Sequence, residues 1–157
     1  MFFKLSRKWE EITVRIWNYR LLPYLSELQF KGQLRELVLI MRQWRDKGTT
    51  NHILINKIME YDKTELYSYF ILYYNAYKER YNKTIDSKVL REFEDFGGCR
   101  FTSHPFENWH TKEYLRSNMA NLWEKHFMGV GKSRISDEEC ETLLRGYKEI
   151  TGEEYSI

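Results

Sequence analysis

The sequence is poor in cysteine, proline and glycine. Of 157 residues, two are cysteine, two are proline and eight are glycine. The two cysteines, Cys99 and Cys140, are too few for a disulfide framework, which excludes the small secreted proteins that depend on one. With so few prolines and glycines and no low-complexity stretch, the chain offers no interdomain linker. Its length also fits one domain better than two, so a single domain is predicted.

Long apolar runs are missing as well. No window approaches the roughly eighteen uncharged apolar residues of a membrane-spanning helix, so no membrane partner is expected. Residues 1–11 carry charges where a secretory signal would need its apolar region. We therefore expect a cytoplasmic protein.

Aromatic residues and helical periodicity are abundant instead. Aromatic residues make up 17% of the chain and hydrophobic residues 42%, which is enough for a core without disulfides or metal. No segment shows the sustained two-residue alternation of a strand. The predicted fold class is all-α, a compact single-domain helical bundle.

Capping residues and glycines indicate where the helices begin and end. Ser26 is a candidate N-cap for a helix that ends near Asp46, with Gly48 as its stop. Capping-box patterns begin two further helices, at Asp62 to Glu65 and at Ser136 to Glu139. Helices are thus predicted over 26–46, 62–81, 87–96, from Thr111 through Trp123, and from Ser136 to Gly152. Between them, residues 99–110 form a long loop of a kind that is often functional.

Charge is distributed unevenly along the chain. Residues 1–60 hold 11 Lys and Arg against 6 Asp and Glu, a balance of +5, whereas residues 61–157 hold 14 against 17, a balance of −3. A basic N-terminal part can face phosphates, but an ordinary solvated surface explains it equally well. Charge alone does not decide the function.

Residues 14–36 carry the most specific pattern, VRIWNYRLLPYLSELQFKGQLRE. The distinctive elements are Arg15-Ile16-Trp17, Leu22-Pro23-Tyr24-Leu25, Gln29, Gly32-Gln33 and Arg35-Glu36-Leu37. This segment resembles the start of the pyrimidine-dimer DNA glycosylases and abasic-site lyases of the phage endonuclease V type. In that family an Arg-Ile or Arg-Leu pair follows the mature N-terminus, and a helix some twenty residues later presents Arg-Glu. A weaker match extends the resemblance to about residue 126.

The resemblance implies a DNA repair enzyme that acts, without a cofactor, on pyrimidine dimers or related lesions in duplex DNA. The implied nucleophile is the N-terminal α-amine of the residue at position 14, Val14, which forms a Schiff base with the damaged nucleotide. An unperturbed α-amine has a pKa of about 7.7 to 8.0, so part of it is neutral near pH 7. The resemblance assigns Glu36 as the acid that also stabilises the imine, and Arg15 and Arg35 as phosphate clamps. The default assembly is a monomer.

The residues themselves are compatible with these roles. Glu36 flanks the apolar stripe of its predicted helix and follows Arg35, so its carboxylate is expected to be partly desolvated beside a guanidinium. Such a carboxylate can act as an acid or as an electrostatic stabiliser. The alternative is a surface ion pair that involves Arg35 and Glu36.

Further DNA contacts are expected along the chain. The predicted DNA-binding residues are Arg15, Gln29, Lys31, Arg35, His104, Trp109 and Lys125. The loop residues His104, Trp109 and His110 can line a lesion pocket or contact the backbone, or can simply be structural. No metal site is predicted, because Cys99, His104, His110 and Cys140 lack the close pairing of zinc ligands.

The segment before Val14 complicates the nucleophile. Residues 1–13 make the nitrogen of Val14 an amide, which is no nucleophile. Translation can start at Val14, processing can remove residues 1–13, a lysine such as Lys31 can supply the amine, or the chain can bind DNA without cutting it. We favour a start at Val14, which divides the chain into an extension, 1–13, and a glycosylase-like domain, 14–157.

Two other functions remain open at this point. One is a non-catalytic all-α module that binds nucleic acid or recognises lesions. The other is a helical protein-interaction domain with no nucleic-acid role. Salt-dependent DNA binding is expected of the glycosylase and of the nucleic-acid-binding module but not of the protein-interaction domain, because neutralising phosphates releases counterions.

Overall fold

Helices form all the regular secondary structure that the computed structural model describes, in residues 15–48, 52–128 and 135–156. Within these ranges lie one 3-10 helix, η1, and six α-helices, α2 to α7. They span Tyr19–Tyr24 (η1), Glu27–Lys47 (α2), Ile53–Ile58 (α3), Lys63–Tyr81 (α4), Ser87–Gly97 (α5), Lys112–Met128 (α6) and Asp137–Thr151 (α7). The predicted all-α class is confirmed, whereas Val14 and the predicted extension, 1–13, lie outside the described residues.

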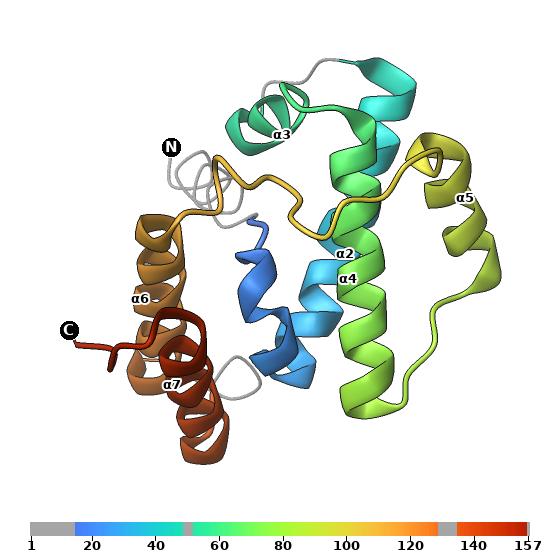
Figure 1. The fold of residues 1–157 in the computed structure, drawn as a ribbon. Coiled ribbons are helices and arrows are strands. Elements are labelled where there is room, and N and C mark those ends of the chain that lie inside the picture. The colour runs from blue at the N-terminus through green and yellow to red at the C-terminus, as the bar shows by residue number, and fades with distance from the viewer. Residues whose placement is uncertain (1–14, 49–51, 129–134, 157) are drawn as a thin grey trace, which may run out of the picture.

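Helix α4 lies near the centre of the molecule, and α5 runs beside it (Figure 1). Helices α2 and η1 also contact α4, while α7 packs against both η1 and α6. The approach of α7 to η1 depends on Gly146, because a Cβ atom at that position would fall within the ring of Tyr24. The 3-10 helix η1 therefore joins the two groups of helices.

The predicted helix ends are confirmed at both sides of α2 and α7. The hydroxyl of Ser26 accepts a hydrogen bond from the backbone N–H of Gln29, 3.5 Å away, and Gly48 closes α2 in the left-handed conformation with φ of 70°. Ser136 and Glu139 form the complete capping box that their sequence predicts. These local signals therefore set the length of α2 and place its two ends.

Two local features differ from the sequence prediction. Asp62 caps α4 through the N–H of Thr64, while Glu65 accepts from the backbone of Phe106, so no capping box is recorded there. The helices η1 and α3 were not predicted. Each has six residues, and η1 contains Pro23, which reads as a turn signal.

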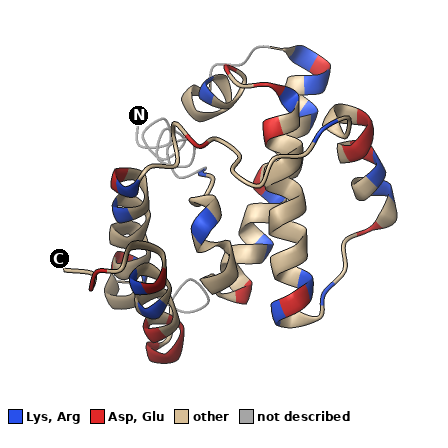
Figure 2. Ribbon diagram, in the orientation of Figure 1, with Lys and Arg blue, Asp and Glu red and all other residues tan. Residues whose placement is uncertain are grey.

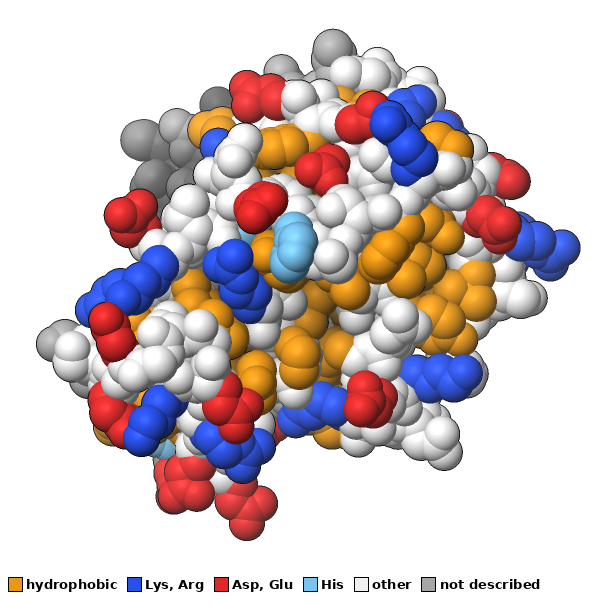
Figure 3. Space-filling view, viewed as in Figure 1, with side chains coloured by type: hydrophobic (Ala, Val, Ile, Leu, Met, Phe, Trp, Pro, Cys, Tyr) orange, Lys and Arg blue, Asp and Glu red, His pale blue; other side chains and the backbone are white. Residues whose placement is uncertain are grey.

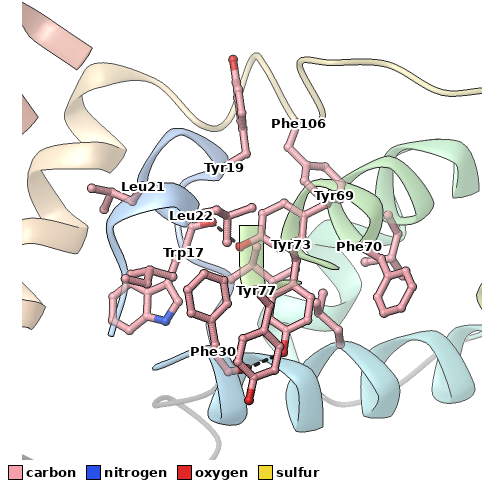
Figure 4. Close-up of a cluster of buried hydrophobic side chains, with 14 of the residues drawn as sticks. Trp17, Tyr19, Leu21, Leu22, Phe30, Tyr69, Phe70, Tyr73, Tyr77 and Phe106 are labelled. Carbon is pink, nitrogen blue, oxygen red and sulfur yellow. Dashed lines mark hydrogen bonds between the residues drawn. The ribbon is translucent and has the colours of Figure 1, made fainter. Parts of the chain in front are cut away.

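The core combines aliphatic side chains with many aromatic rings, several of which come from α4 (Figure 4). Tyr69, Phe70 and Tyr73 of α4 are fully buried. Phe70 stacks on Phe93 of α5, with ring centroids 3.8 Å apart and planes 3° from parallel. Removing such a ring, as in Phe93→Ala, is expected to cost about 3 to 5 kcal/mol.

The surface mixes charges of both signs. Lys and Arg alternate with Asp and Glu on most helices, and acidic residues gather at the start of α7 (Figure 2). Hydrophobic side chains show between the charged ones on the face that Figure 3 presents. Among the described helices, none combines the length and the apolar character needed to cross a bilayer.

Candidate active site at the N-terminal segment

The extended segment 15–18 runs into η1 and is held by side chains instead of by a sheet. The buried side chain of Gln33 on α2 bonds it from one side. The backbone N–H of Trp17 donates to Gln33 Oε1 at 2.9 Å, and Gln33 Nε2 donates to the carbonyl of Arg15 at 3.0 Å. Alternate residues of this segment therefore bind to α2.

Helix α6 holds the same segment through its other backbone groups. The hydroxyl of Tyr114 donates to the carbonyl of Ile16, and the N–H of Asn18 donates to Asn118 Oδ1 at 2.6 Å. Asn118 is 2% exposed. Buried backbone polar groups are costly unless they are paired, so these contacts fix the path of the segment between α2 and α6.

Glu36 lies one turn along α2 from Gln33 and reaches the start of this segment. Its Oε2 atom accepts a hydrogen bond from the backbone N–H of Arg15 at 3.0 Å and another from Gln33 Nε2 at 3.3 Å. Glu36 therefore binds the backbone at Arg15, the first residue that the structure describes.

Burial raises the pKa of Glu36 from 4.5 to about 7. The Arg15 N–H and the positive charges of Arg15, Arg35 and Lys125 act in the opposite direction but do not cancel the cost of desolvation. Near neutral pH the carboxyl group is thus divided between its protonated and ionised forms. A group of this kind can both donate and accept a proton.

Glu36 opens into a cavity of about 140 Å³ between α2, α6 and the N-terminal segment. The lining residues are Arg15, Trp17, Leu28, Gln29, Gly32, Gln33, Glu36 and Lys125. The guanidinium of Arg15 lies 5.4 Å from the centre of the Trp17 ring, a cation–π distance. The cavity therefore combines a protonatable carboxyl group with two cations.

The cavity brings together Arg15, Gln29, Glu36 and Lys125 of the residues proposed from the sequence. Arg35 is exposed on the next face of α2, where it influences the charge of Glu36 without lining the cavity. Lys31 is exposed, lies outside the cavity lining, and pairs with Glu27 across 3.8 Å.

The loop residues lie on another part of the structure. His104 is exposed, and its Nδ1 atom is 3.1 Å from the hydroxyl of Tyr19. Trp109 is partly buried against Tyr61 and Phe106, and Lys57 lies 5.4 Å from its ring centre. Neither His104 nor Trp109 lines the cavity that contains Glu36.

His110 is a structural residue of the loop. It is fully buried, and its Nδ1 atom accepts the backbone N–H of Tyr19 at 3.0 Å. Burial lowers its pKa from 6.5 to about 3, so the ring is neutral near pH 7. A neutral, buried ring is unsuited to binding phosphate.

Sequence reasoning gave Gln33 no role of its own, although its position carries a signal. Gln33 falls three residues after Phe30 and four before Leu37, on the stripe that α2 buries. A polar residue at an apolar position of an amphipathic helix must find partners inside the protein. Trp17, 5% exposed, is a second cavity residue that received no role.

Comparison with known proteins identifies one family. A family model described as pyrimidine dimer DNA glycosylase matches residues 14–89. The match begins at Val14 and includes Arg15, Gln33 and Glu36, whereas Lys125 lies beyond it. No curated protein and no solved structure matches the chain.

Proposed function

Because residues 14–89 match the pyrimidine dimer DNA glycosylase family, we propose that this chain breaks the glycosidic bond of the damaged nucleotide through an amine-linked imine and then cuts the strand. The substrate is duplex DNA that contains a pyrimidine dimer or a related lesion. The reaction needs no cofactor, because an amine and a carboxyl group supply its chemistry.

One observation carries this proposal. The backbone N–H of Arg15 donates to Glu36 Oε2 at 3.0 Å, and Glu36 has a pKa of about 7. Position 14, which the family resemblance assigns as the nucleophile, is bonded directly to Arg15. Val14 itself lies outside the described residues, so the proposal rests on its neighbour in the chain.

In the first step the neutral amine attacks C1′ of the damaged nucleotide. A bond from nitrogen to C1′ forms, the glycosidic bond breaks, and the departing base takes a proton. The sugar ring then opens to an imine, which makes the proton on C2′ acidic. Loss of that proton breaks the bond from C3′ to its phosphate oxygen, so the strand is cut by β-elimination. Glu36 is the group placed to exchange these protons and to stabilise the cationic imine.

The positive side chains are proposed to hold the DNA around this centre. Arg15 and Lys125 line the cavity and Arg35 lies beside it, so all three can bind phosphates that flank the lesion. Gln29 at the cavity can hydrogen-bond to the nucleotide. A dimer is already poorly paired, which lowers the cost of moving a nucleotide out of the stack.

His104, Trp109 and Lys31 are proposed as outer DNA contacts only, since none of them lines the cavity. The exposed ring of His104 and the exposed ammonium group of Lys31 are suited to phosphate contacts at physiological salt. Mutating them is expected to weaken binding without stopping the reaction.

The nucleophilic amine has two candidate sources, the backbone nitrogen of position 14 and a lysine side chain. In a chain that retains residues 1–13 the nitrogen of position 14 is an amide, so the favoured nucleophile requires a chain that begins at Val14. A side-chain amine is the other source. Lys125 lines the cavity, whereas Lys31 does not, so Lys125 is the better placed of these two lysines.

The direct test is strand cleavage of a duplex with one cyclobutane thymine dimer. An undamaged duplex and a duplex with a preformed abasic site serve as controls. Cleavage at both the dimer and the abasic site supports glycosylase and lyase steps together. Cleavage only at the abasic site would contradict the glycosylase step, and salt-dependent binding without cleavage would favour the non-catalytic module.

A further inference from the structure

Gln33 joins the two halves of the candidate site through a single buried amide. We propose that Gln33 is a positioning residue, which holds the backbone of residues 15–17 against Glu36 and fixes the orientation of the Glu36 carboxyl group. This inference rests on the proposed function, because it concerns the same amine and carboxyl group.

The amide of Gln33 uses all of its hydrogen-bonding capacity. Its oxygen accepts the Trp17 N–H at 2.9 Å and lies 2.9 Å from the Tyr69 hydroxyl. Its nitrogen donates to the Arg15 carbonyl at 3.0 Å and to Glu36 Oε2 at 3.3 Å. A glutamine side chain has two donor hydrogens and two acceptor lone pairs, and each has a partner here.

The backbone partners determine which way the amide faces. The N–H of Trp17 can only donate and the carbonyl of Arg15 can only accept, so the oxygen of Gln33 faces Trp17 and its nitrogen faces Arg15. The second hydrogen of that nitrogen then points to Glu36. One side chain, 1% exposed, therefore fixes both the segment and the carboxylate.

Other residue types cannot make this set of contacts. A glutamate at position 33 would set acceptors against the Arg15 carbonyl and the Glu36 carboxylate. A methionine of similar size would leave the Trp17 N–H without its side-chain acceptor and Glu36 without one donor. Buried polar groups without partners are costly, so the segment would shift to find new partners.

Tyr69 of α4 contacts both Gln33 and the N-terminal segment. Its hydroxyl lies 2.5 Å from the carbonyl of Trp17 and 2.9 Å from Gln33 Oε1, so its single proton is shared between them. Tyr69 is fully buried. It holds both Gln33 and the segment that Gln33 binds.

Tyr73 provides a matched control on the same helix. It is also fully buried, and its hydroxyl donates to the carbonyl of Phe30 at 2.6 Å, with no recorded bond to Gln33 or residues 15–18. Tyr69→Phe and Tyr73→Phe each remove one buried hydroxyl from α4. Only Tyr69→Phe loosens the contact between Gln33 and the segment.

Losing the Gln33 contacts is expected to slow the reaction by displacing the groups that react. Displacing a reacting group by about 1 Å can cost on the order of 100-fold in rate. In a chain that begins at position 14, Gln33→Met is therefore expected to slow imine formation about 100-fold in a single-turnover reaction on abasic-site DNA. Tyr69→Phe is expected to slow it by about 10-fold, whereas Tyr73→Phe should stay within about 2-fold of wild type.

DNA-binding measurements distinguish a positioning role of Gln33 from general damage to the fold. The Kd for a duplex with a tetrahydrofuran abasic-site analogue should change less than about 3-fold in all three variants, because the phosphate-binding cations remain. A Gln33→Met variant that reacts at the wild-type rate would overturn the proposal. An equal loss of rate in Tyr69→Phe and Tyr73→Phe would also overturn it. If Gln33→Met does not fold, this comparison of the two tyrosine variants decides.

A carbon-13 NMR titration of the Glu36 carboxyl group tests the contact without any reaction. Arg15, Arg35 and Lys125 are the charged groups that act on this carboxyl, and they are unchanged in Gln33→Met. Losing the Gln33 donor should raise the pKa of Glu36, because that bond favours the ionised form. If neither the 157-residue chain nor a chain that begins at position 14 forms an imine, the proposed function is overturned. The titration would then decide on Gln33: a raised pKa of Glu36 supports its contact, and an unchanged one overturns it.

Discussion

Two carboxyl groups lie near cationic side chains of α2, one at the middle of the helix and one near its C-terminal end, and their pKa values are shifted in opposite directions. Glu92 of α5 accepts two hydrogen bonds from Arg42, at 2.9 and 3.1 Å, and one from Arg45 at 3.0 Å. These charged donors lower the pKa of Glu92 to about 2. Glu36 accepts from the amides of Arg15 and Gln33, and burial raises its pKa to about 7.

The difference shows what makes a carboxylate useful for proton transfer. Direct guanidinium contacts hold Glu92 ionised throughout the physiological range, so it can only form ion pairs. Glu36 is largely desolvated, and Arg15 and Lys125 line the same cavity without displacing its amide partners, so both of its protonation states are populated near pH 7. The two glutamates therefore predict contrasting results when each is changed to glutamine.

The largest effect is expected on activity. Glu36→Gln removes the proton-transferring group and should slow strand cleavage about a thousand-fold or more, while DNA binding stays within a few fold. Glu92→Gln is the matched control and should cleave at the wild-type rate. Single-turnover cleavage of dimer-containing DNA measures both, and surviving cleavage in Glu36→Gln would refute the role of this carboxyl group.

The pH dependence of stability should separate the same two variants. The pKa of Glu36 is raised on folding, so its stabilising influence is complete below pH 4.5 and is lost as the pH rises through about 7. Relative to wild type, Glu36→Gln should therefore gain stability from pH 4.5 to pH 8, by about 3 kcal/mol at most. For Glu92→Gln the sign is reversed: its stabilising ion pairs are lost as the pH falls from about 4.5 toward 2.

Urea unfolding of wild type and Glu36→Gln at pH 5 and pH 8 measures the first change, and urea unfolding of wild type and Glu92→Gln at pH 5 and pH 3 measures the second. If the stability difference between Glu36→Gln and wild type is the same at both pH values, Glu36 is not desolvated as we describe. A stability gain of Glu36→Gln that accompanies its loss of activity would mark a residue retained for function.

A smaller effect is expected on DNA affinity. Lys125→Ala removes a cation that lines the cavity, so it should weaken binding of lesion DNA and reduce the slope of log K against log salt by about 1. Arg42→Ala, at the Glu92 end of α2, should leave that slope unchanged. Fluorescence anisotropy at several salt concentrations measures both, and equal slopes would place Lys125 away from the DNA.

Much of the fold could be predicted from local signals. Ser26, Gly48 and Ser136 act through their own backbone neighbours, so their positions in the sequence are sufficient to place helix ends. The helix η1 contacts α4 and α7, and α3 buries Ile55 and Ile58, but six residues are too few to show a period in the sequence. Glu65 lost its capping role because the distant Phe106 offers it a backbone N–H.

The candidate site was predicted less completely than the fold. The resemblance pointed to Arg15 and Glu36, which the structure brings to one cavity, but it gave no role to Gln33, whose partners lie on other segments. His104 and Trp109 were placed in the loop correctly, yet the loop packs away from this cavity. Spacing along a helix reveals a shared face, whereas contacts between segments require the tertiary structure.

Borohydride trapping on dimer-containing DNA tests the central claim most directly, because it captures the imine between protein and sugar. The 157-residue chain should be compared with a chain that begins at position 14. We predict a trapped adduct with the shorter chain, much reduced in Glu36→Gln and absent from the longer chain. Adducts with neither form, on dimer and on abasic-site DNA alike, would contradict the imine mechanism.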